Sequence, residues 1–208
     1  MGEFVQLVCT LDDENRAHEL YEENQRKYAS PENQYQPEDD HLPWVGMLGE
    51  SVFNHWLHRE RIHHEWLHEN PKYKPDFRIG TSELDCKTVK RQVPPRIDYT
   101  CCVPTRQVWK RVDWYVFLSY QYRERRMWLL GAMIYDTFRA EAVDFKAGDQ
   151  VHPGFIVRAG NEMSNVAMAR LVKPAALASL WRLQGRGPAA QPPQDDEYTD
   201  RQGQLKLG

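Results

Sequence analysis

The sequence lacks the features that mark several large classes of protein. No apolar run approaches the roughly 18 residues that a membrane-spanning helix needs, and the N-terminal residues contain no signal-peptide core. No heptad or other fixed repeat is present, which argues against a coiled coil or a solenoid. A formal charge of −3 is far from that of a histone-like polycation. We therefore expect a cytoplasmic protein with no membrane as partner.

Cysteine is also scarce, with only four in the chain and no Cys-x-x-Cys pair. Neither a zinc-finger framework nor a secreted disulfide scaffold fits this spacing. We expect the thiols of Cys9, Cys86, Cys101 and Cys102 to be buried or half-buried.

Apolar and aromatic residues are plentiful enough for a packed core. The 208 residues are 41% hydrophobic and include 7 Trp, 10 Tyr and 7 Phe. This length predicts one domain, which we assign to residues 1–183. Residues 184–208 are rich in Gly, Pro, Gln and charge and are expected to form a disordered tail.

Hydrophobic periodicity and turn residues predict an α/β fold. The hairpin strands at 114–120 and 127–135 are apolar on both faces, as in a sheet covered by helices on its two sides. We therefore expect a central mixed β-sheet flanked by helices. The other expected strands are 4–9, 73–79, 83–90 and two weaker ones within 150–171, and the expected helices are 12–28, 47–69, 105–111 and 174–183.

Two acidic residues are expected to face each other across the hairpin at Gly80-Thr81. Glycine at the first position of a two-residue loop suits a type II′ turn, and opposed residues then sum to 161. This register sets Asp76 opposite Asp85, with Cβ atoms about 4.5–5.5 Å apart. Lys87 lies on the same face as Asp85, two residues further along the strand.

Opposed carboxylates destabilise a strand pair unless something neutralises them. A hard divalent cation such as magnesium, bound by carboxylate oxygens, a main-chain carbonyl and water, would do so. The alternative is a solvated hairpin in which Lys87 is the counter-ion.

A third carboxylate precedes this hairpin in the sequence. Glu50 follows Gly49 near the start of the second expected helix, about 20° from Leu57 on the helical projection and hence at the edge of the apolar stripe. It is therefore expected to turn towards the sheet, although glutamate is also favoured in the first turn of a helix for its interaction with the dipole.

Glu50 on a helix, Pro75-Asp76, and Asp85-x-Lys87 together resemble the active-site signature of the PD-(D/E)xK phosphodiesterase superfamily, including small phage and bacterial nucleases. The resemblance spans about residues 45–135 and implies a restriction-endonuclease-like core. It implies a metal-dependent DNA nuclease that uses Mg²⁺, with Mn²⁺ able to substitute.

The resemblance also assigns roles to individual residues. Asp76 and Asp85 would bind the metal together with the carbonyl of Cys86, and Glu50 would complete that site or help to hold a second ion. Lys87 would orient and help to deprotonate the attacking water. Whether cleavage is internal or from an end, whether RNA is also cut, and whether the chain forms a homo-oligomer stay open.

A basic segment follows the signature. Residues 86–111 carry seven bases against Asp98 alone, a net charge of +6, whereas residues 11–40 carry a net charge of −7. Some nucleases of this superfamily have a Gln-x-x-x-Tyr pair on the next helix, but here Gln107 is followed four residues later by Arg111. The candidate nucleic-acid contacts are Lys90, Arg91, Arg106, Gln107 and Lys110.

Two other interpretations compete with a nuclease. His64-Glu65-Trp66-Leu67-His68 matches the zinc-protease signature H-E-x-x-H, which requires both histidines on one helical face. Asn70-Pro71 ends the expected helix immediately afterwards, and no third protein ligand can be identified. The second alternative is a nucleic-acid-binding or scaffold protein of the same fold without catalytic activity.

Overall fold

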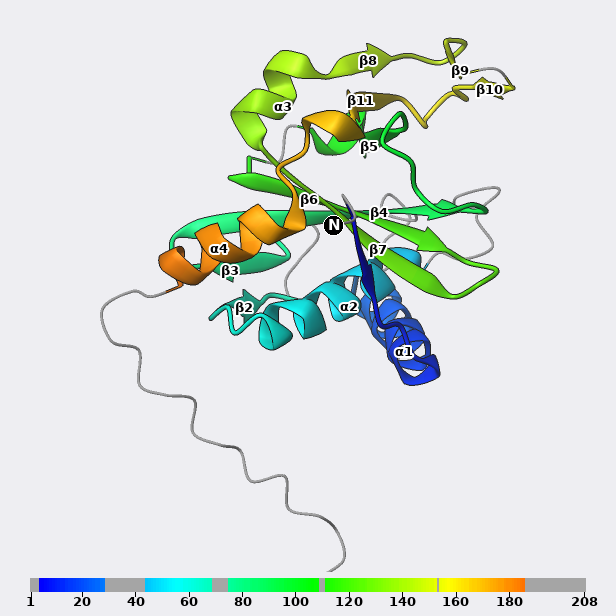
Figure 1. The fold of residues 1–208 in the computed structure, drawn as a ribbon. Helices are drawn as coiled ribbons and strands as arrows, with labels where there is room; N and C mark the ends of the chain where they lie inside the picture. The colour runs from blue at the N-terminus through cyan, green and yellow to red at the C-terminus, as the bar shows by residue number, and fades with distance from the viewer. Residues whose placement is uncertain (1–3, 29–43, 69–74, 109–110, 153, 186–208) are drawn as a thin grey trace, which may run out of the picture.

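A six-stranded sheet forms the centre of the molecule in the computed structural model, which describes residues 4–28, 44–68, 75–108, 111–152 and 154–185 (Figure 1). Strands β4 and β6 are parallel, and every other neighbouring pair is antiparallel. The expected mixed sheet is therefore confirmed. Its order is β1 (Val5–Leu7), β7 (Arg126–Ile134), β6 (Trp114–Gln121), β4 (Ser82–Arg91), β3 (Phe77–Ile79) and β2 (Glu65–Trp66).

Helices cover both faces of this sheet, as expected. Helices α1 (Leu11–Tyr28) and α2 (Val45–Arg59) lie below it in Figure 1. Together with α4 (Pro174–Gln184), they pack against the sheet in one apolar cluster. Helix α3 (Tyr135–Glu141) lies on the opposite face, where Phe138 packs in a second cluster. All eight residues of β6 are buried because one apolar cluster packs against each face of this strand.

A second, smaller sheet lies above the first and was not expected from the sequence (Figure 1). Its order is β5 (Thr100–Pro104), β11 (Met163–Ala167) and β8 (Val143–Phe145). The connection from β4 to β6 passes through β5 and the short 3₁₀ helix η1 (Thr105–Gln107), where a longer helix over 105–111 was expected. The remaining elements are β9 (Gln150–His152), β10 (Phe155–Ile156) and the 3₁₀ helix η2 (Met168–Arg170).

The second helix is shorter than its predicted range of 47–69, because α2 ends at Arg59. The N–H of Arg61 donates to His58 O and the N–H of Ile62 donates to Leu57 O, which is the hydrogen-bond pattern of a Schellman motif. Arg61 adopts a φ of +54°, a left-handed conformation that glycine usually provides at this position. The chain then leaves the helix, and Glu65–Trp66 pair with β3 instead.

The other long elements lie where the sequence predicts them. Helix α1, the β6–β7 hairpin and α4 match their expected ranges within about two residues, and α4 extends to Gln184. Of the predicted disordered tail 184–208, Gln184 is the last residue of α4 and Gly185 follows it, whereas the remainder lies outside the described residues. No helix in the described part of the chain is both long and apolar enough to cross a membrane.

Candidate nuclease site at the edge of strand β4

The hairpin at Gly80-Thr81 forms in the predicted register. Ile79 pairs with Ser82 and Phe77 pairs with Leu84, so opposed residues sum to 161. Gly80 has a φ of +58°, as expected for glycine at the first position of this turn. The pairing ends at Phe77, and the edge of β4 beyond Leu84 therefore extends past the end of β3.

Asp76 lies just outside this ladder, not directly opposite Asp85 as predicted. Its N–H donates to Leu84 O at 2.9 Å, and its carbonyl accepts the N–H of Leu67 at 2.8 Å. Its carboxylate Oδ2 accepts the N–H of Cys86 at 2.7 Å. Asp76 is thus held at the edge of β4, with its carboxylate against the backbone that immediately follows Asp85.

Asp85 and Lys87 form a buried ion pair on one face of β4, and their predicted common face is confirmed. Asp85 is only 1% exposed, and Lys87 Nζ contacts its Oδ2 while the lysine side chain is 14% exposed. In the parallel ladder their neighbours are Tyr115 and Phe117, which belong to the cluster on the α3 side. Burial raises the pKa of Tyr115, and the negative charge of Asp85 raises it further.

Glu50 approaches β4 from the opposite face. It is buried on α2, 7% exposed, so its predicted orientation towards the sheet is confirmed. The indole Nε1 of Trp66 donates to its Oε2 at 3.4 Å. Next to it, a Cβ atom on Gly49 would lie 1.8 Å from Thr88 Oγ1, so only glycine lets α2 approach β4 this closely.

Cys86 lies among these charged groups. Burial raises the pKa of its thiol well above its usual value, the charges of Asp76, Glu50 and Asp85 raise it further, and that of Lys87 lowers it. All four predicted catalytic side chains therefore act electrostatically on one thiol. Because the N–H and C=O of one strand residue point to the same edge, the carbonyl of Cys86 is directed towards the edge where Asp76 lies.

The carboxylates of Asp76 and Asp85 and the main-chain carbonyl of Cys86 are oxygen ligands of the type that a hard divalent cation prefers. Asp85 is paired with Lys87, and Asp76 accepts the N–H of Cys86. Within the described ranges, no group of three or more His, Cys, Asp or Glu side chains lies together as a metal-binding cluster. An ion bound by both aspartates must therefore compete with contacts that the protein itself provides.

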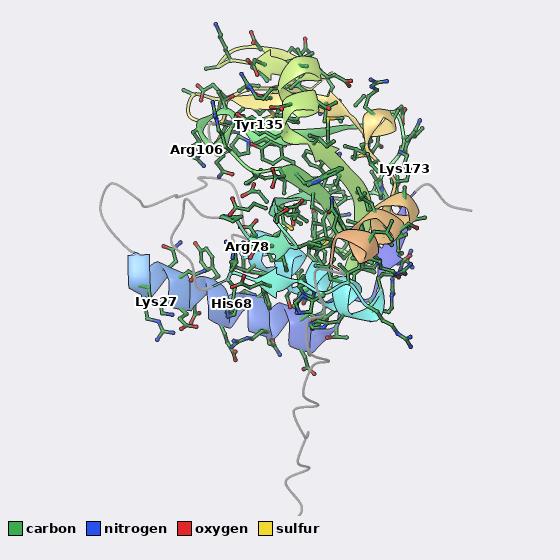
Figure 2. The ribbon with its side chains drawn as sticks, turned by 90° about the vertical axis from the view of Figure 1, so that its left-hand side faces the viewer. Lys27, His68, Arg78, Arg106, Tyr135 and Lys173 are labelled. Atoms are coloured by element: carbon green, nitrogen blue, oxygen red, sulfur yellow. The ribbon has the colours of Figure 1, made fainter. Side chains whose placement is uncertain are left out.

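The predicted nucleic-acid contacts do not form a single surface. Lys90 and Arg91 end β4 and, by strand alternation, point to opposite faces. Arg91 Nη2 donates to Thr100 O at 2.8 Å. Arg106 is exposed in η1, on the upper part of the molecule near Tyr135 and apart from Arg78 of β3 (Figure 2). Half-buried Gln107 ends η1, and Lys110 lies outside the described residues.

Sequence analysis missed two tyrosines that gather cations near the end of β4. Lys90 Nζ lies 5.9 Å and the Arg123 guanidinium 6.0 Å from the centre of the Tyr122 ring. The guanidinium groups of Arg91 and Arg96 lie 5.1 and 5.7 Å from the Tyr99 ring. The run Gln121–Arg126, which joins the two hairpin strands, carries a sequence signal for such a group in its Tyr-Arg-Glu-Arg-Arg composition.

The zinc-protease motif has no helical basis in the structure. Residues 64–68 lie beyond the end of α2, so the two histidines do not share a helical face. His64 Nε2 contacts Asn54 Oδ1 at 2.7 Å, whereas the ring of His68 packs against Trp66 at 4.6 Å. A zinc-protease site of the H-E-x-x-H type needs both histidines on one helical face, and His64 and His68 do not meet this requirement.

The four cysteines are free, and each is buried or half-buried, as predicted.

Comparisons with models of protein families, with curated proteins and with solved structures give no significant match to this chain.

Proposed function

We propose that this protein is a divalent-metal-dependent nuclease that hydrolyses phosphodiester bonds of DNA, with a restriction-endonuclease-like core. The observation that carries the proposal is the arrangement around Cys86. The Asp85–Lys87 ion pair lies on one face of β4, the Asp76 carboxylate accepts the N–H of Cys86 at the strand edge where β3 ends, and Glu50 is buried on the α2 side. Carboxylates beside an amine are the groups that metal-assisted phosphodiester hydrolysis requires.

The proposed roles follow from these positions. Asp76, Asp85 and the carbonyl of Cys86 would hold Mg²⁺ or Mn²⁺, which lowers the pKa of bound water and offsets charge on the phosphate. With the ion bound to Asp85, the Asp85–Lys87 ion pair would be weaker. Lys87 would then orient the attacking water and stabilise negative charge on the phosphoryl oxygens. Glu50 would complete the site from the α2 side or help to hold a second ion.

The two tyrosine-centred groups supply cations for the DNA backbone on the two faces of the end of β4. Lys90 and Arg123 beside Tyr122, and Arg91 and Arg96 beside Tyr99, lie towards the end of the strand that carries Asp85 and Lys87. Cations near aromatic rings can contact phosphates while the rings stack on unpaired bases. We therefore expect DNA to extend from the β4 edge towards the loop after Arg91.

Cleavage assays test the proposal. Linear, circular, nicked and single-stranded DNA are incubated with Mg²⁺ or Mn²⁺, and product lengths are compared. Asp85→Asn and Asp76→Asn are expected to lower the rate at least about 100-fold, because each removes a carboxylate charge from the proposed metal site. Asp136→Asn, an exposed carboxylate on α3, serves as the matched control and should cut normally. Absence of cleavage of every form by the wild-type protein would rule out this function.

One observation favours a second candidate, a nucleic-acid-binding protein without catalytic activity. Lys87 already neutralises Asp85, so this carboxylate needs no ion for stability. Binding of DNA that weakens steeply with salt but is never followed by cleavage would identify this second function.

A further inference from the structure

A cavity of about 570 Å³ lies where the ends of α2 and α4 meet, apart from the candidate nuclease site. Arg59, which lines it, is nine residues after Glu50 on α2, which corresponds to about 13–14 Å along the helix axis. A volume of this size is within the usual range of small-molecule sites. We refer to it as the arginine pocket; its lining residues are Arg59, Glu60, Arg61, His63, Arg182 and Gly185.

The arginine pocket has more positive charge than its own carboxylate can balance. Three guanidinium groups line it against the single carboxylate of Glu60. Arg182 donates to both the carbonyl and the carboxylate of Glu60, and Arg59 Nε lies 3.6 Å from Glu60 Oε1. Glu60 therefore fixes the positions of two arginines but offsets the charge of only one.

Helix C-termini attract cations, so the arginines could serve only to offset the helix dipoles. That explanation is insufficient, because each helix end contributes only about half a negative charge. The terminal carbonyls are also largely satisfied: Leu57 O and His58 O accept the N–H groups of Ile62 and Arg61, and Trp181 O accepts that of Gly185. A positive excess remains in the pocket.

Arg61 occupies a backbone position that does not suit arginine. Its φ of +54° is a conformation that glycine adopts without cost and that other residues adopt with strain. Glycine is used elsewhere in the same wall, since a Cβ atom on Gly185 would lie 3.1 Å from His63 O. A charged side chain that lines a cavity and is held in a strained backbone position is typical of a binding site.

We infer that the arginine pocket binds a phosphate-bearing anion through the guanidinium groups of Arg59, Arg61 and Arg182. The planar guanidinium fork pairs two donors with two phosphate oxygens, which makes arginine well suited to this class of ligand. The inference goes beyond the proposed nuclease function and does not depend on it, because the pocket shares no residue with the Asp76–Asp85 edge.

The test uses inorganic pyrophosphate and isothermal titration calorimetry on the full chain in EDTA, so that no divalent ion contributes. Arg61→Gly should weaken pyrophosphate binding about tenfold or more while the Tm stays at or above that of the wild type, since glycine relieves the left-handed conformation. Arg59→Gln should weaken binding as well. Arg16→Gln, which removes one exposed arginine from α1, should leave binding unchanged.

A second arm identifies the source of the phosphate. A short single-stranded oligonucleotide without terminal phosphates is titrated into the same variants. If Arg61→Gly weakens its binding in parallel, the pocket takes a phosphate of the nucleic-acid backbone; if only pyrophosphate is affected, the ligand is a small free anion. No pyrophosphate binding at millimolar concentration, or equal affinity in the wild type, Arg61→Gly and Arg59→Gln, would overturn the inference.

Discussion

Gly49 and Thr88 touch where helix α2 crosses strand β4, and the contact leaves no room for a side chain on the helix. A Cβ atom at Gly49 would lie 1.8 Å from Thr88 Oγ1 and 2.9 Å from its Cβ. This close approach holds the neighbouring Glu50 against the strand that carries Asp85 and Lys87. The geometry of the candidate site therefore depends on one glycine outside it.

Gly49→Ala should separate α2 from β4 and destabilise the protein by about 2–4 kcal/mol, somewhat above the usual cost of overpacking because the overlap includes the Cβ atom. Urea unfolding followed by circular dichroism measures this loss. Gly46→Ala is the matched control, since nothing lies within 4 Å of a Cβ atom there and alanine favours the helix. Equal stability of the two variants would show that α2 and β4 are not in this contact.

A second long-range contact ties α1 to the β6–β7 hairpin. The Glu14 carboxylate accepts hydrogen bonds from Tyr120 Oη at 2.6 Å and from Arg125 Nε at 2.8 Å. Burial alone would raise the pKa of Glu14, but the hydrogen bonds from Arg125 and Tyr120 and the charge of Arg125 outweigh it and lower the pKa.

Glu14→Gln should cost about 1–3 kcal/mol at pH 7, because it weakens hydrogen bonds to a charged acceptor. Since the pKa of Glu14 is lower in the folded protein, its contribution is present above the unfolded value of about 4.3 and is lost as the pH falls through the folded value. The difference between wild type and variant in chemical denaturation should therefore shrink towards acid pH. Glu19→Gln, an exposed change on the same helix, should alter stability by less than about 1 kcal/mol.

His64 should make the protein less stable in mild acid. Burial lowers the pKa of His64, so the folded protein binds this proton less readily than the unfolded chain does. Above the unfolded pKa of about 6.5, His64 causes no loss of stability. The loss grows as the pH falls from that value towards the lower pKa of His64 in the folded protein. Urea midpoints at pH 7, 6 and 5 should fall less for His64→Gln than for the wild type. Parallel pH profiles for the two proteins would contradict this assignment.

The sequence predicted those parts of the fold that local rules determine. A two-residue turn fixes register, so Gly80-Thr81 was enough to pair Phe77 with Leu84. The unbroken apolar pattern of β6 and β7 likewise predicted strands covered on both faces. Burial of Glu50 followed from its position relative to the apolar stripe of α2.

The failures occurred where distant contacts decide the structure. Helix α2 ends at Arg59 because Arg61 adopts a left-handed conformation, which has no sequence signature, and Glu65–Trp66 pair with β3 instead of continuing the helix. The hairpin register was extended one residue too far, because Asp76 leaves the ladder to bind Leu84 and Leu67. The strands β5 and β8 are five and three residues long and were not predicted, because each is stabilised by pairing with β11, which lies within the predicted range 150–171 but far from both in the sequence.

The Asp85–Lys87 pair provides a way to test the metal site without measuring activity. Lys87→Met removes the ion-pair partner of the buried Asp85 carboxylate, which should cost about 3–5 kcal/mol in EDTA. If Asp76 and Asp85 hold a divalent ion, that ion can replace the lost positive charge and restore stability by binding only the folded protein. The double variant Asp85→Asn/Lys87→Met removes both charges and is the matched control.

The most direct measurement is therefore the Tm of these proteins in EDTA, in about 10 mM Mg²⁺ or Mn²⁺, and in NaCl of equal ionic strength. At roughly 2–4 °C per kcal/mol for a chain of this size, binding of the ion should raise the Tm of Lys87→Met by about 3–8 °C. The wild-type protein should respond less, and the double variant should not respond. An identical response of Lys87→Met and the double variant, or none in either, would show that Asp85 does not bind a divalent ion and would contradict the proposed nuclease site.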